Sequence, residues 1–67
     1  MLGMAVGTLI TICTNVELID GKKITSGDIG IILQCFGNRV IDSNFDYLVL
    51  INNIELYVFE DEIKVYT

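Results

Sequence analysis

Residues 47–59 read YLVLINNIELYVF, two apolar runs on either side of Asn52-Asn53. Both runs are rich in the β-branched and aromatic residues that favour strands. Asparagine tolerates the positive φ angles that a two-residue hairpin turn requires. The stretch therefore predicts a β-hairpin with strands at Tyr47–Ile51 and Ile54–Phe59, and this hairpin decides the fold class.

The rest of the chain carries the same kind of signal. Turn residues at Asp20-Gly21, Gly27-Asp28 and 37–39 separate further apolar runs. Gly30, inside one of these runs, predicts a bulge or a close approach of another strand. No window has the 3.6-residue apolar period of a helix, and Glu60-Asp61-Glu62 predicts only a short 3-10 turn. The predicted strands outside the hairpin are Thr8–Thr14, Ile29–Phe36 and Ile63–Tyr66.

Five short strands in 67 residues predict a single all-β domain spanning residues 1–67, with residues 1–6 as a loose tail. An open sheet of this size would leave two unpaired edges and one apolar face in water. Curling into a small barrel buries one face and removes most of the edge. We therefore expect a five-stranded β-barrel.

The charged residues suggest which way each strand faces. Glu55 and Lys64 belong outside, which places Tyr57, Phe59 and Tyr66 outside with them. We expect Leu48 and Leu50 to face the core with Ile54, Leu56 and Val58, and Ile63 and Val65 to join them. On that assignment an exposed aromatic and aliphatic interaction surface consists of Tyr47, Val49, Ile51, Tyr57, Phe59 and Tyr66.

Composition excludes several kinds of chemistry. The chain has no histidine, so His-based catalytic triads and His-ligated metals are absent. Its two cysteines, Cys13 and Cys35, lie in apolar runs and predict buried thiols in a reducing compartment. No nucleophile–base pair stands out, and the carboxylates at residues 60–62 predict a solvated turn. We therefore expect no catalytic residues, no metal site and no cofactor.

The order of elements resembles the SH3-like small β-barrel. The residues that carry the resemblance are Gly27-Asp28 before the strand that starts at Ile29, and the acidic turn with Ile63 before the last strand. The plan is similar to that of KOW-type and photosystem-subunit barrels. The chain departs from peptide-binding SH3 domains because it has no tryptophan and no proline, which help to form their groove for Pro-rich ligands.

These features predict a non-enzymatic interaction or structural accessory module that docks on a protein partner or on its own copies. Fifty-two per cent of the residues are apolar, more than so small a core can bury. The alternative is an acidic barrel that associates with nucleic acid or mimics it to regulate a DNA- or RNA-binding protein. Four Lys and Arg against nine Asp and Glu make direct nucleic-acid binding the weaker expectation.

The setting of the protein is predicted from the same composition. The uncharged stretch 1–16 contains too many polar residues and glycines for a spanning helix, so we expect a cytoplasmic protein with no membrane contact. Small size and acidity fit an accessory protein of a virus or mobile element, which would then act in the host cytoplasm.

Overall fold

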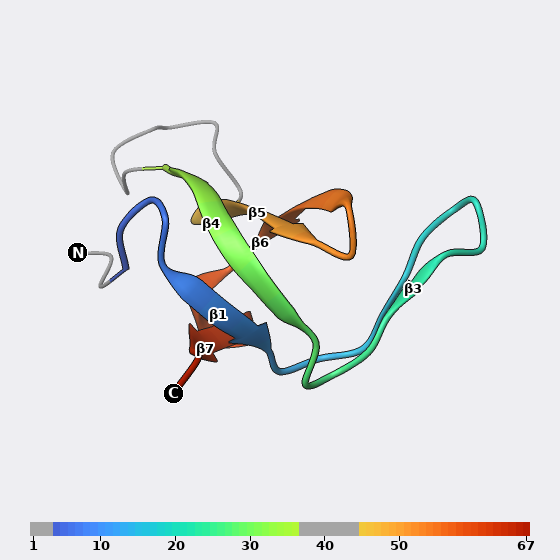
Figure 1. Ribbon diagram of the computed structural model, residues 1–67. Coiled ribbons are helices and arrows are strands. Elements are labelled where there is room, and N and C mark those ends of the chain that lie inside the picture. The colour runs from blue at the N-terminus through green and yellow to red at the C-terminus, as the bar shows by residue number, and fades with distance from the viewer. Residues whose placement is uncertain (1–3, 37–44) are drawn as a thin grey trace.

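A computed structural model describes residues 4–36 and 45–67 of the chain (Figure 1). It is all-β, with one 3-10 turn, η1. Five strands form an antiparallel sheet in the order β6-β5-β4-β1-β7, and two short strands form a separate ladder, β2-β3. The elements are β1 (Leu9–Ile12), β2 (Val16–Glu17), β3 (Lys23–Ile24), β4 (Ile29–Cys35), β5 (Tyr47–Ile51), β6 (Ile54–Val58), η1 (Glu60–Glu62) and β7 (Ile63–Val65).

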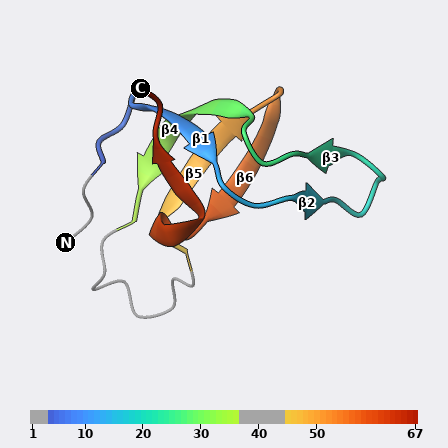
Figure 2. The same ribbon diagram turned by 90° about the horizontal axis from the view of Figure 1, so that it is seen from below.

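The predicted fold class is confirmed at this level. All five expected strands are present, with ends within two residues of those predicted, and the acidic turn is the expected 3-10 turn. The two additional strands, β2 and β3, pair within a hairpin between β1 and β4 that extends away from the main sheet (Figure 2). In the described part of the chain the end strands β6 and β7 do not pair with each other. The turn expected at 37–39 lies outside the described residues.

The register of β5 and β6 follows from the turn between them. Asn52 and Asn53 have φ angles of 54° and 64°, the left-handed conformation that a two-residue hairpin needs. The turn pairs Ile51 with Ile54, and the ladder continues to the pair Tyr47–Val58. Residues paired across two strands project to the same side of the sheet. The odd-numbered residues of β5 therefore share a side with the even-numbered residues of β6.

This register corrects the predicted orientation of β5. Tyr47, Val49 and Ile51 were expected outside, but all three are fully buried. Leu48 and Leu50, expected inside, are half-buried on the opposite side. The sequence of β5 is apolar on both sides, so no charge in it marks the outer face, and only the pairing with β6 does. The orientation expected for β6 is right, with Val58 buried and Glu55 exposed.

The core is built almost entirely from β-branched side chains. Tyr47 is its one aromatic member, and every strand of the main sheet contributes to it. Val65, expected inside, is instead exposed; it lies on β7, the end strand of the sheet, and has a neighbouring strand on one side only among the described residues. The buried set is Ile10, Ile12, Ile24, Ile32, Tyr47, Val49, Ile51, Val58 and Ile63.

The chain before β1 closes one end of this core. The backbone N–H of Met4 donates to the hydroxyl of Tyr47 at 3.2 Å, and the thiol of Cys35 donates to the carbonyl of Met4 at 3.3 Å. The loose tail expected at residues 1–6 therefore does not include Met4, and residues 1–3 lie outside the described part. The expectation of two buried thiols is wrong for Cys13, which is exposed, while Cys35 is half-buried; both are free.

Gly30 occurs where two strands approach too closely for a side chain. A Cβ atom there would collide with Cγ1 of Ile51 and would lie 2.7 Å from the carbonyl oxygen of Leu50. This confirms the close-approach interpretation of Gly30. The bulge lies further along β4, between Ile32 and Gln34.

We expect Gly30→Ala to lower the free energy of unfolding by about 3 kcal/mol, because a backbone oxygen cannot move aside as a flexible side chain can. Gly21→Ala is the reference. Gly21 has a φ of 90° and open space around its Cβ position, so only backbone strain of about 1 kcal/mol applies. Urea denaturation followed by circular dichroism measures both values. Equal losses in the two variants would contradict the close-contact explanation.

Candidate functional site

Four aromatic side chains gather on the surface at one end of the hairpin β5-β6. The ring of Tyr57 lies 5.8 Å from that of Phe36 and 5.7 Å from that of Phe45, measured between centroids. The Phe45 and Phe59 rings are 5.0 Å apart. Such distances and tilts are those of attractive ring contacts. We call these four side chains, Phe36, Phe45, Tyr57 and Phe59, the aromatic patch.

The patch is exposed although its rings touch. Tyr57 is 53% exposed, Phe59 42% and Phe45 39%, while Phe36 is half-buried. Tyr57 pairs with Leu48, so a half-buried leucine continues the apolar surface onto β5. Apolar surface of this kind, contiguous and open to solvent, commonly marks a contact with another molecule.

Backbone and side-chain hydrogen bonds hold the patch in place. Phe36 N–H donates to the carbonyl of Asp46 at 2.8 Å, which brings the ends of β4 and β5 together. The Asp46 carboxylate accepts from the backbone N–H of Glu60 at 2.8 Å. The Glu62 carboxylate accepts from the N–H of Phe59, also at 2.8 Å. The rings therefore project from a fixed backbone.

The structure divides the predicted interaction residues into three groups. Tyr57 and Phe59 belong to the aromatic patch, and Tyr66 is exposed on the chain after β7, without a ring contact to the patch among those observed. Tyr47, Val49 and Ile51 belong to the core and cannot form a surface. Phe36 and Phe45 were missed by the sequence prediction. The sequence could have indicated them, because they stand at the two ends of the segment between the predicted strands Ile29–Phe36 and Tyr47–Ile51. Pairing of these strands brings the two ends together.

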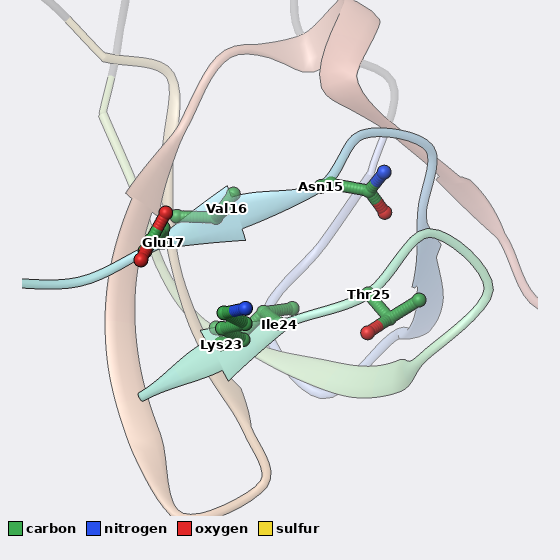
Figure 3. A pocket seen from close by; sticks show the side chains of 6 residues that line it. All are labelled: Asn15, Val16, Glu17, Lys23, Ile24 and Thr25. Carbon is green, nitrogen blue, oxygen red and sulfur yellow. The ribbon is translucent and has the colours of Figure 1, made fainter. Parts of the chain in front are cut away.

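A second surface feature lies along the β2-β3 hairpin. An open groove is lined by Asn15, Val16, Glu17, Lys23, Ile24 and Thr25 (Figure 3). Glu17 and Lys23 are cross-strand partners of opposite charge. The Asn15 side chain accepts from the N–H of Ser26 at 2.8 Å, which closes the base of the hairpin. The groove is therefore lined by the two short strands of the hairpin and the residues next to them.

Neither a metal-binding cluster of side chains nor a membrane-spanning helix occurs in the described residues. In the residues the structure describes, no group of three or more Cys, Asp or Glu is arranged to hold a metal ion. No helix in the same ranges has the length and apolar character needed to cross a bilayer. Burial raises the pKa of the Tyr47 phenol, and the nearby carboxylates of Glu60 and Asp46 raise it further.

Comparisons with known proteins give no further guidance. No family model, no curated protein and no solved structure matches the chain.

The raised pKa of Tyr47 makes stability depend on alkaline pH. The folded state binds the phenolic proton more tightly than the unfolded state, whose pKa is about 10. The resulting stabilisation is complete below pH 10 and is lost as pH rises through that value toward the folded-state pKa. We expect the difference in unfolding free energy between wild type and Tyr47→Phe to shrink across this range. Urea titrations from pH 8 to 11.5 measure it, and a constant difference would contradict the burial of the phenol.

Proposed function

We propose that this chain is a non-enzymatic protein-interaction module that docks through the aromatic patch. The observation that carries the proposal is the contact of Phe45 with both Tyr57 and Phe59 while all three rings remain well exposed. Exposed rings already fixed by neighbours lose little conformational entropy when a partner covers them. Tyrosine adds a polar hydroxyl to a large apolar body, and it is enriched at interfaces for that reason.

We also propose that the fold is an SH3-like small β-barrel of the plan found in KOW-type and photosystem-subunit proteins. The support is the order of elements, which runs strand, projecting hairpin, long strand, tight hairpin, 3-10 turn and short last strand. Gly27-Asp28 stands at the end of the projecting hairpin, and Asp28 accepts hydrogen bonds from Thr25 N–H and from the Asn52 side chain. On this plan the aromatic patch lies beside the 3-10 turn.

Nucleic-acid mimicry is the second candidate function. Five carboxylates accompany the patch residues between positions 45 and 62, and this stretch contains no Lys or Arg. A DNA- or RNA-binding protein could accept such a surface in place of phosphates. An accessory role in a virus or mobile element stays a prediction, as does a cytoplasmic location.

Capture from an extract of the native host tests the docking role. We expect wild type to retain a specific protein and Tyr57→Ala to bind it about thirtyfold more weakly, the effect of losing an interface residue worth roughly 2 kcal/mol. Tyr66→Ala is the matched control, because Tyr66 is 48% exposed and lies outside the patch. Circular dichroism checks that both variants fold. Equal retention by Tyr57→Ala and wild type would contradict docking through the patch.

A further inference from the structure

Several carboxylates lie beside the aromatic patch. The segment from Phe45 to Glu62 contains five of the nine carboxylates of the chain and no basic residue. Two of them are fixed against the patch backbone. The Asp46 carboxylate is bonded to the residue after Phe59, and the Glu62 carboxylate is bonded to Phe59 itself. The full set is Asp46, Glu55, Glu60, Asp61 and Glu62.

Glu55 extends this charge along β6. It lies two residues before Tyr57 on the same strand, so both side chains project to the outer side of the sheet. Glu55 and Asp61 are exposed, whereas Asp46, Glu60 and Glu62 are half-buried. The patch therefore has carboxylates on the β6 side and at the 3-10 turn.

No basic side chain of the described residues neutralises these carboxylates. In residues 4–36 and 45–67 the ion pair observed is Lys22 with Asp20, at 3.8 Å near the tip of the projecting hairpin. Lys23 lies on the same hairpin. Lys64 lies on β7, two residues after Glu62, and forms no ion pair within the described residues. Among residues 4–36 and 45–67, the carboxylates beside the patch therefore have no ion-pair partner.

We propose that the aromatic patch binds a basic, arginine-bearing polypeptide segment. This inference rests on the proposed docking function and names the partner's chemistry. A guanidinium group stacks on aromatic rings and at the same time donates two parallel hydrogen bonds to a carboxylate in a planar geometry. Exposed rings beside carboxylates that form no ion pair in the described residues offer both contacts at once, and an uncharged apolar partner would use only the rings.

Charge also argues against the other occupants of this surface. A second copy of the chain would bring the same five carboxylates to the contact and a net charge of −5, and like charges brought together in an interface are costly. Nucleic acid would meet the same repulsion through its phosphates. A basic polypeptide segment is the occupant that the charges attract.

An NMR titration with a defined peptide tests the proposal. The probe is an eight-residue peptide of alternating arginine and glycine, and its control has neutral citrulline in place of each arginine. We expect the ring resonances of Phe45, Tyr57 and Phe59 to shift with the arginine peptide. We expect at least tenfold weaker binding of the citrulline peptide, and weaker binding of the arginine peptide when salt is raised from about 0.05 M to 0.5 M.

Charge variants show whether the position of the carboxylates matters. The double variant Glu55→Gln, Asp61→Asn should bind the arginine peptide roughly three- to tenfold more weakly. The control is Glu17→Gln, Asp20→Asn, which removes the same charge from exposed positions on the projecting hairpin. It should change the affinity less than about twofold, since these positions lie away from the patch.

Three results would overturn the inference. These are equal affinity for the two peptides, equal losses in the two double variants, and a dimer in sedimentation whose formation Tyr57→Ala abolishes. Failure of this inference can be distinguished from failure of the docking function. If Tyr57→Ala loses a captured host protein while the arginine peptide does not bind, docking stands and the basic partner is wrong. If Tyr57→Ala alters neither capture nor peptide binding, both are wrong.

Discussion

The left-handed conformation of Asn52 and Asn53 is the constraint on which the rest of the structure depends. It makes the connection between β5 and β6 a two-residue turn, and the length of that turn fixes which residues of the two strands are partners. Once Ile51 pairs with Ile54, the side of β6 that carries Glu55 and Tyr57 must be the outer side of β5 as well. A turn one residue longer would place Tyr57 on the same side of the sheet as Tyr47.

Much of the fold could be predicted from the sequence. Asparagine and glycine mark the turns, because only certain residues adopt the backbone conformations that turns need. The β-branched runs mark the strands, and the acidic turn before Ile63 is where the sequence placed it. The side to which β5 faces was predicted wrongly because its apolar residues are not alternated with polar ones. The turn length already contained the answer, since it dictates the pairing.

The candidate site was harder to predict because it is made of residues distant in the sequence. The sequence indicates Tyr57 and Phe59, because both are large residues that the alternation along β6 places on its outer side. Phe36 and Phe45 become their neighbours only because β4 and β5 pair, which brings Phe36 opposite Asp46. The bulge between Ile32 and Gln34 shifts the register just before this point. A sequence prediction that ignores such a shift misplaces the residues beyond it.

The attachment of Met4 to Tyr47 has a consequence for the synthesis of the chain. The hydrogen bond joins residues 43 positions apart, and β1 lies in the sheet between β4 and the last strand, β7. Strand β1, which is made before the other strands, therefore lacks one of its neighbours until β7 has left the ribosome. Folding that depends on such distant pairings is slow and cooperative. The growing chain must keep its isoleucine-rich early segments from aggregating until that segment arrives.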